Sequence, residues 1–277
     1  MNKKIPQNKI YEILSKLDGS VGLYINVLDT EELFQINPDR VFPSASVIKI
    51  PVLALLLKDV FDGKVDWAGP RSIAPNNRVG GTGILTYLDK TYEPSLSVLA
   101  FLMITMSDNT ATNEIIDIIG FDRFNQFWKE QHYEHITLMR KMLDFEAIKQ
   151  GRNNYMCAGE AGRLLVDIAT GKCISKKASG IIIDMMQHQQ CLNKLPALLP
   201  AIPSWASVEE RRNMEPGTVL VGNKTGDLDS IQHDVGIFTL PDGRRYIIAI
   251  FTGGLKNTGD GIHAIAEVSR VVFDAMR

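Results

Sequence analysis

The sequence predicts an α/β (α+β) fold: one antiparallel sheet flanked by the terminal helices, with an inserted all-helical lobe. Two observations lead to this prediction. Alternating strand patterns occur only near the two ends of the chain, and helical periodicity fills the stretch between them. Hairpin-type segments from opposite ends most simply share one sheet. We therefore predict a single domain over residues 1–277, with an α/β lobe from 1–40 and 214–277 and an all-helical lobe over 41–213.

The first predicted elements are a helix and a hairpin. Apolar residues at helical spacing in "IYEILSKLDG" predict a helix that ends at Gly19. The alternating segment "VGLYINVLD" predicts a strand, and Asp29 and Thr30 form the turn into a second strand at "ELFQINP". These two strands supply the N-terminal part of the sheet.

The middle of the chain reads as a succession of helices. "SVIKIPVLALLLKDVF" predicts one helix, with Pro51 near its first turn, where proline is tolerated. "SLSVLAFLMITMS" is almost wholly apolar, so we expect that helix to be central. Further helices are predicted at "ATNEIIDIIG", "DRFNQFWKEQ", "AGEAGRLLVDIATG" and "ASGIIIDMMQHQ". After Pro216 strands return at "TVLVGNKTG", "HDVGIFTL" and "RRYIIAIFTGG", and "GIHAIAEVSRVVFDAMR" closes the chain as a helix.

Bulk composition excludes several classes of function. The chain is 45% hydrophobic and 22% charged, as in ordinary globular proteins. A net charge of −2 gives no basic surface for nucleic acid. There is no apolar run long enough to span a membrane. The first residues lack the apolar core of a signal peptide, so we expect either a cytosolic protein or one whose leader is missing from this sequence.

Cysteine and histidine patterns give no sign of a metal or a cofactor. Cys157, Cys173 and Cys191 lack metal-ligand spacing, and their odd number argues against a disulfide scaffold. His132 and His135 stand three apart without a matching cysteine or carboxylate pattern, so we expect a solvated helix face. We predict no metal and no cofactor.

Three short motifs contain residue types suited to acyl transfer. Ser46 and Lys49 share a helix face, so the lysine lies beside the hydroxyl and, once desolvated, can act as its base. Alone, this pair is a weak signal, and the simpler interpretation is an N-cap serine with a snorkelling lysine. "MSDNTATN" places Ser107 and Asn109 in a loop after an apolar helix, where an N-cap is the simple alternative.

The third motif is "NKTG", predicted on a strand near the end of the chain. Lys224 and Thr225 leave room for a ligand along the strand, and Gly226 allows a close backbone approach. The alternative is an edge strand protected from aggregation by its lysine.

Together and in this order, the motifs S-x-x-K, S-D-N and K-T-G resemble class A β-lactamases and penicillin-binding proteins. The resemblance extends from "GSVGLYINVLDT" to "GIHAIAEVSRVVFDA" and implies a β-lactamase-like fold. It also implies a small-molecule substrate, a β-lactam or acyl-peptide-like compound, with no cofactor and no nucleic acid. We expect a monomer.

The resemblance further implies a role for each motif residue. Ser46 would form the acyl-enzyme, Lys49 would help to activate it, and Ser107 would pass a proton to the leaving nitrogen. Substrate contacts would come from the remaining motif positions: Asn109, Lys224, Thr225, Gly226 and Asp227. The backbone N–H groups of Ser46 and Asp227 would form the oxyanion hole.

The sequence departs from the family in two places. Class A enzymes use a loop glutamate to activate the deacylating water, and an ungapped count from Ser107 puts Leu143 there. Asp144 and Glu146 are candidate replacements, or else simple loop ion pairs. Where many class A enzymes carry an arginine after K-T-G, this chain has His233, which would bind a carboxylate only at low pH or is merely a strand residue.

Several functions therefore stay open at the sequence level. The first is a serine β-lactamase-like hydrolase. The alternative is a penicillin-binding or DD-peptidase-type enzyme, or another serine amide or ester hydrolase such as a glutaminase, with slow deacylation. A non-catalytic acyl sensor is a further class, but such sensors are usually tethered to a signalling domain.

Overall fold

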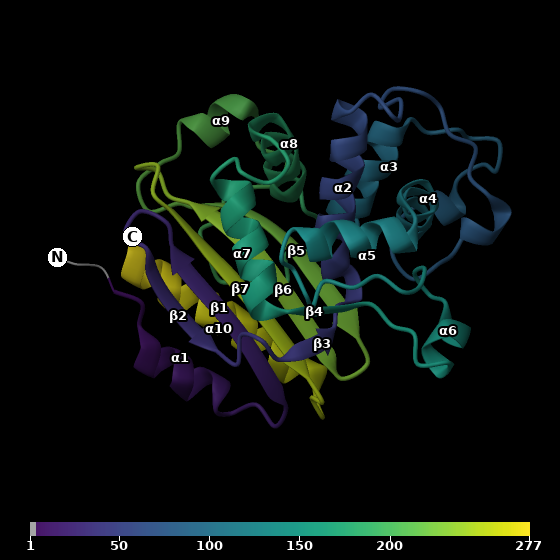
Figure 1. Ribbon diagram of the computed structural model, residues 1–277. Helices are drawn as coiled ribbons and strands as arrows, with labels where there is room; N and C mark the ends of the chain where they lie inside the picture. Colours follow the sequence, from purple (N-terminus) through teal and green to yellow (C-terminus); the bar gives the residue numbers. More distant parts are fainter. Residues whose placement is uncertain (1–3) are drawn as a thin grey trace.

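The computed structural model describes residues 4–277 and contains one five-stranded antiparallel sheet in the order β2-β1-β7-β6-β5 (Figure 1). Both ends of the chain contribute to it, because β1 pairs with β7, for example Ile25 with Ile248. This confirms the predicted sheet. Its strands are β1 (Ser20–Val27), β2 (Glu32–Ile36), β5 (Leu220–Leu228), β6 (Ile231–Thr239) and β7 (Arg245–Gly253).

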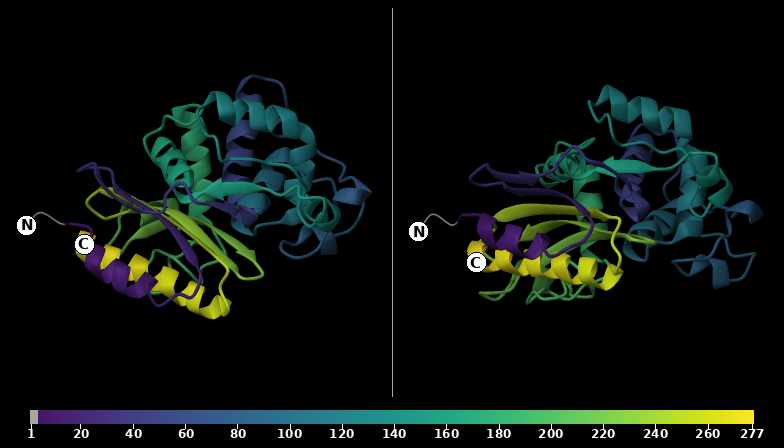
Figure 2. Two further views of the ribbon diagram at one scale, coloured as in Figure 1. Left: turned by 60° about the horizontal axis from the view of Figure 1, so that its bottom comes forward. Right: turned by 90° about the horizontal axis from the view of Figure 1, so that it is seen from below.

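Helices cover both faces of this sheet. Helices α1 (Gln7–Leu14) and α10 (Thr258–Met276) lie side by side on one face, as Figure 2 shows. Helices α7 (Ala158–Ala169) and α8 (Lys176–Gln187) pack on the other face. Because side chains alternate along a strand, Leu23 joins the α10 side of the core and its neighbour Tyr24 joins the α7 side.

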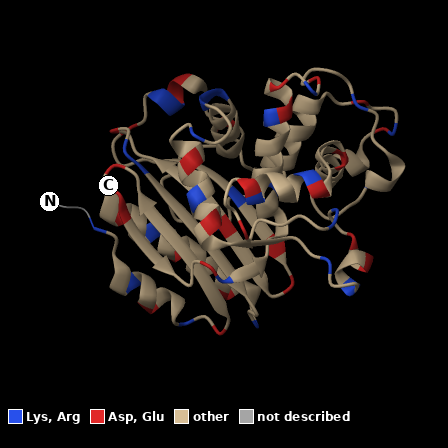
Figure 3. Ribbon diagram, in the orientation of Figure 1, with Lys and Arg blue, Asp and Glu red and all other residues tan. Residues whose placement is uncertain are grey.

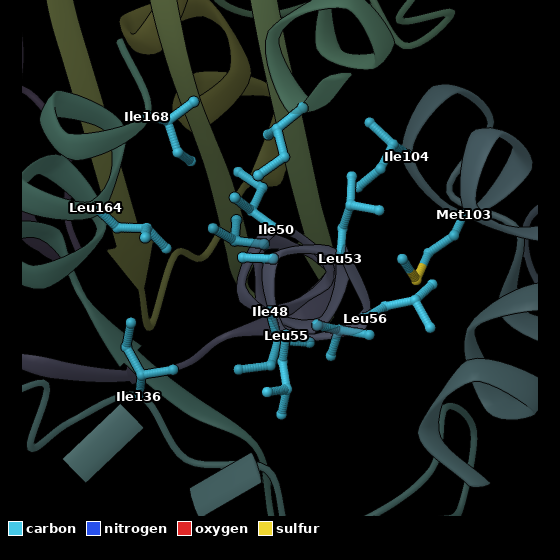
Figure 4. Close-up of a cluster of buried hydrophobic side chains, with 14 of the residues drawn as sticks. Ile48, Ile50, Leu53, Leu55, Leu56, Met103, Ile104, Ile136, Leu164 and Ile168 are labelled. Atoms are coloured by element: carbon cyan, nitrogen blue, oxygen red, sulfur yellow. The ribbon is translucent and has the colours of Figure 1, made fainter. Parts of the chain in front are cut away.

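The helical lobe is built around α2 (Lys49–Phe61), which a short 3₁₀ turn, η1 (Ala45–Ile48), precedes. Ten of the 13 residues of α2 are buried, and apolar side chains from several other elements surround it (Figure 4). Helix α3 (Leu96–Thr105), expected to be central, instead lies partly at the surface, with Val98 36% and Phe101 38% exposed. The prediction that α3 is the central helix was therefore wrong, and α2 is the central helix of the lobe.

The lobe over 41–213 was expected to be all helical, but it also contains a two-stranded sheet of β3 and β4. These strands are only three residues long, too short for an alternating pattern to be recognised. The remaining elements are α4 (Asn109–Ile119), α5 (Phe121–Glu130), α6 (Phe145–Lys149), α9 (Val208–Arg212), η2 (Pro75–Asn77), η3 (Leu85–Tyr87), β3 (Val41–Pro43) and β4 (Tyr155–Cys157).

Charged residues of both signs are interspersed over the helices and loops (Figure 3). Within residues 4–277, no helix has the length and apolarity that crossing a bilayer demands. Cys157, Cys173 and Cys191 are free thiols.

Candidate active site

The start of α2 is brought against the outer strand of the sheet. The turn η1, which carries Ser46, packs on β5 next to Gly226. A Cβ at position 226 would lie 3.1 Å from the Cβ of Ala45 and 3.1 Å from Cγ2 of Val47. Since any side chain here would force the two segments apart, glycine is what allows the serine to sit beside the strand.

Ser46 opens into a pocket of about 250 Å³ between the two lobes. The pocket is also lined by Ser107, Asn109, Thr225 and Asp227. Among residues 4–277, none forms a hydrogen bond with the Ser46 hydroxyl, so this oxygen is free to meet a ligand. The structure thus brings together residues from all three sequence motifs.

Lys49 is fully buried and hydrogen-bonded on every side. Its Nζ lies 2.8 Å from the carbonyl oxygen of Ser107, 3.0 Å from Oγ of Ser107 and 2.9 Å from Oδ1 of Asn109. These are three acceptors for the three protons of an ammonium. In the neutral amine, two protons would serve the carbonyl and the amide, and the lone pair would accept from the Ser107 hydroxyl.

Two effects lower the pKa of Lys49: its burial and the nearby charge of Lys224. Loss of hydration lowers the pKa of Lys49 well below its usual value, and the nearby charge of Lys224 lowers it further. Burial likewise lowers the pKa of Lys224 to about 8. Burial therefore favours the neutral amine at both lysines, and the charge of Lys224 further opposes a charge on Lys49.

Ser107 is held in a left-handed conformation, with φ of 53°, by its neighbour Asp108. The Asp108 carboxylate caps α4 at Ala111 N, 2.9 Å away, and accepts from Leu85 N at 2.9 Å. A Cβ at Gly83 would lie 2.2 Å from that carboxylate. Asp108 is thus a positioning residue that fixes the loop carrying Ser107.

Lys224 and Thr225 lie on β5, an edge strand of the sheet. Lys224 Nζ is 3.1 Å from Oγ of Ser107 and 2.9 Å from the carbonyl oxygen of Thr225, which leaves one N–H for a ligand. Because an edge strand has unpaired backbone groups, β5 can also offer backbone N–H groups to a bound molecule.

Lys194 is a residue of the site that the sequence motifs did not indicate. It is fully buried, and its Nζ contacts Oδ1 of Asp227 at 2.8 Å and the carbonyl oxygens of Gly226 and His233 at 3.2 and 3.1 Å. Its charge offsets that of Asp227, which would otherwise repel an anion at the pocket mouth. The sequence offered one indication that Lys194 is buried: it stands between Leu192 and Leu195 in "LNKLP".

His233, considered from sequence as a carboxylate ligand or a strand residue, is a buried residue of β6. Its Nε2 donates to the carbonyl oxygen of Pro43 at 2.9 Å, and its Nδ1 accepts from Thr252 N at 3.1 Å. Burial lowers the pKa of His233 to about 4, so the ring is neutral near neutral pH. It does not line the pocket.

The loop after α5 gives the pocket an apolar wall of Leu143, Phe145 and Ile148. Asn113 holds this loop, because its side chain bonds both backbone groups of Met142, at 2.7 and 3.3 Å. Leu143, which takes the place of the family's glutamate in an ungapped count, therefore faces the same pocket as Ser46.

The two candidate carboxylates of this loop are engaged elsewhere. Asp144 caps α6 by accepting from Ala147 N at 2.9 Å, and Glu146 pairs with Lys149 at 2.7 Å in a largely exposed position. Neither lines the pocket. A role for either in deacylation stays a prediction.

Known proteins are similar to this chain in sequence and in architecture. A β-lactamase from Bacteroides uniformis is 26% identical over 98% of this chain and 91% of its own length. The crystal structure of a β-lactamase from Sphaerobacter thermophilus superposes with a TM-score of 0.82 at 26% identity, covering 97% of this chain and 95% of the other. A mutant of PBP-A, solved as an acyl-enzyme complex with penicillin G, gives a TM-score of 0.83 at 28% identity over 98% and 95% of the two chains.

The family model described as "Beta-lactamase enzyme family" matches residues 5–276, nearly the whole chain. The resemblance inferred from the three motifs is confirmed by this match, and so is the β-lactamase-like fold. The chain belongs to the β-lactamase enzyme family and is a serine β-lactamase-like hydrolase.

Proposed function

We propose that Ser46 is the nucleophile that opens a β-lactam amide and carries the acyl group. The observation that carries this proposal is the position of Ser46 at a pocket next to two buried lysines joined through Ser107. A serine hydroxyl needs a base to become nucleophilic, and a lysine with a lowered pKa can supply it.

The proposed acylation step moves protons between Ser46, Lys49, Ser107 and the leaving nitrogen. Neutral Lys49 takes the Ser46 proton as Oγ bonds to the carbonyl carbon. The C–N bond then breaks, and Ser107 gives its hydroxyl proton to the leaving nitrogen. Lys49, only 3.0 Å from Ser107 Oγ, returns its extra proton to that oxygen and becomes neutral again.

Substrate binding uses the remaining motif residues. The free N–H of Lys224, with the Thr225 hydroxyl, would bind a carboxylate. Asn109 Oδ1 is occupied by Lys49, and Nδ2 donates to the Gly80 carbonyl at 3.0 Å. One amide proton of Asn109 is thus left for a substrate side chain. The backbone N–H groups of Ser46 and Asp227 would receive the oxyanion.

Hydrolysis of the acyl-enzyme needs a base that activates a water molecule. The apolar wall of Leu143, Phe145 and Ile148 contains no such base. Leu143 supplies no base, so we propose that deacylation is the slower half of the cycle. Asp144 and Glu146 remain the carboxylates of the loop that a rearrangement would have to bring into the pocket.

Mass spectrometry and hydrolysis of nitrocefin together test the proposal. We expect the wild-type chain to gain one acyl adduct that disappears with time, and Ser46→Ala to gain none. Ser97→Ala changes a serine outside the pocket and is the matched control. An adduct of equal mass and rate on Ser46→Ala would refute Ser46 as the nucleophile.

A further inference from the structure

Side chains of three different types meet where the turn after α5 passes the start of α7. They are His135, Cys157 and Glu160, and their nitrogen, sulfur and oxygen atoms all lie within 4.8 Å of one another. Nδ1 of His135 is 3.0 Å from Oε1 of Glu160. None of the three lines the pocket at Ser46.

Backbone pairing explains why residues distant in sequence converge. Thr137 and Tyr155 form an antiparallel bridge, with N–H to oxygen distances of 3.1 and 3.0 Å in the two directions. This bridge brings the segments that carry His135 and Cys157, each two residues away from it, next to one another. Cys157 ends β4 and is the N-cap of α7, so Glu160 follows in the first turn of that helix.

The surroundings of the two buried members suit a cation. Cys157 is fully buried and Glu160 is 4% exposed. Burial raises the pKa of the Cys157 thiol to about 11, and the nearby Glu160 carboxylate also raises it, so the thiol is protonated in the metal-free chain. A divalent ion would replace that proton and bind the thiolate beside the buried carboxylate.

Other groups also contact Glu160. Its oxygens accept from Glu134 N and His135 N at 2.8 and 2.9 Å, and Arg163 Nη2 stands 3.6 Å away. The Arg163 side chain is half-exposed, its guanidinium lies over the Tyr133 ring, and Nη2 donates to the His132 carbonyl oxygen at 3.1 Å. The two backbone donors fix the carboxylate in place and leave a lone pair toward the histidine.

We propose that His135, Cys157 and Glu160 bind one zinc ion through Nδ1, Sγ and a carboxylate oxygen. Tetrahedral zinc, with Zn–N of about 2.0–2.1 Å and Zn–S of about 2.3 Å, sets neighbouring ligand atoms about 3.3–3.8 Å apart. The observed spacings of 3.0 Å up to 4.8 Å thus require shifts on the order of 1 Å. His135 is 37% exposed in its side chain, which provides an entry path and a fourth position for water.

Charges and protons balance when zinc binds to these three side chains. The Cys157 thiol releases its proton to solvent, and the His135 proton moves from Nδ1 to Nε2, leaving the ring neutral. A thiolate and a carboxylate then offset the two charges of zinc. The bound ion would tie residues 132–135 to the start of α7, a structural role separate from acylation at Ser46.

The sequence hides this site because its ligands do not follow a compact metal-binding spacing. His135 lies 25 positions before Glu160, and Cys157 is a single cysteine rather than one of a pair. The alternative is that Glu160 only anchors the preceding turn, in which case no metal binds.

Cobalt, as a spectroscopic stand-in for zinc, tests the ligand set on the full chain freed of metal by a chelator. We expect one equivalent of Co²⁺ to produce the thiolate-to-cobalt charge-transfer band and Zn²⁺ to displace it. At free zinc a hundred times the dissociation constant, the melting temperature should rise by about 5–10 °C. Cys157→Ser should abolish the band, and His135→Asn should weaken binding at least about tenfold.

Matched controls separate this site from other thiols and from folding defects. Cys173→Ser and Cys191→Ser remove the other two cysteines, and both should keep the band and the one-to-one binding. Circular dichroism and acylation of Ser46 confirm that Cys157→Ser is folded. If the folded wild-type chain shows no saturable one-to-one binding, or Cys157→Ser binds as the wild type does, the zinc site is refuted and the proposed function is unaffected.

Discussion

Lys49 and Lys224 direct their ammonium groups at one and the same atom, Oγ of Ser107, at 3.0 and 3.1 Å. The two lysines come from different lobes and are both fully buried. Two cations sharing one small acceptor in a desolvated site repel each other, so losing one proton is favourable. In the proposed acylation, Lys49 would be the base and Lys224 the cation, with the Ser107 hydroxyl between them.

The rate of acylation should depend on pH on both sides of a maximum. Lys49 must be neutral, and its neutral fraction grows as pH rises through its lowered pKa, so the acidic limb rises. Lys224 loses its charge above a pKa of about 8, so kcat/KM for a carboxylate-bearing substrate should fall above pH 8, by about tenfold per unit once well past it.

Lys224→Arg identifies the origin of the alkaline limb. Arginine keeps its charge throughout the accessible range, so the fall above pH 8 should disappear even if the absolute rate is lower. An alkaline limb that stays at the same pH in Lys224→Arg would exclude Lys224 as its cause.

Ser107→Ala should slow acylation by about 10²–10⁴-fold, the usual contribution of a positioned proton donor. The reason is that the proposed step delivers the proton to the leaving nitrogen through the Ser107 hydroxyl, which lies 3.0 Å from Lys49 Nζ. Stopped-flow measurement of adduct formation checks this. Thr82→Ser, which keeps the hydroxyl that bonds the Ser107 carbonyl at 2.6 Å, is the control and should leave the rate within a few-fold.

Leu143→Glu should speed deacylation by about 10²–10⁴-fold by placing a general base in the pocket. Leu143 lines the same pocket as Ser46, on a loop that Asn113 holds. The lifetime of the acyl adduct is the measurement. Leu143→Gln, similar in size but without a base, is the control; equal lifetimes in the two variants would rule out the mechanism.

The substitutions Asp144→Asn and Glu146→Gln test whether either carboxylate takes part in deacylation. Asparagine is as good an N-cap as aspartate, so α6 should persist, and Glu146 is exposed. From their present hydrogen bonds we expect both variants to deacylate within about threefold of the wild type. A loss of about 10² or more in either one would assign the base to that residue.

Gly226→Ala should lower stability by about 1–3 kcal/mol, because the new methyl group overpacks the contact with η1. It should also lower acylation, since Ser46 moves with η1. Gly180→Ala is the matched control: nothing lies within 4 Å of a Cβ there, and alanine favours the helix. Urea unfolding and adduct formation measure the two effects, and an unchanged stability in Gly226→Ala would contradict the close-packing account.

The sheet, the order of most helices and the three motifs could be read from the sequence because their signals are local. The strand signals in "VGLYINVLD" and in the continuous apolar run of "RRYIIAIFTGG" depend only on burial of one or both strand faces. Elements of three to five residues, such as β3, β4 and α6, were not predicted. Segments this short are stabilised by their neighbours rather than by their own periodicity.

Which helix is central depended on the tertiary structure. α2 and α3 are both apolar, but only α2 is enclosed on all sides, and its buried Lys49 is tolerated because Ser107 and Asn109 supply three acceptors. The same is true of Lys194, whose partners come from β5 and β6. The hydrogen-bond partners of both lysines are distant in sequence, so the local sequence could not predict them.

The sequence by itself determined the family and the three motifs that mark the candidate site, since a hydroxyl, an amine and their order along the chain are local properties. Only the tertiary structure decided that Lys49 and Lys224 are buried beside Ser107, that Lys194 pairs with Asp227, and that Leu143 lines the pocket. Those outcomes depend on desolvation and on charges only a few ångströms apart, and both arise when remote segments pack together.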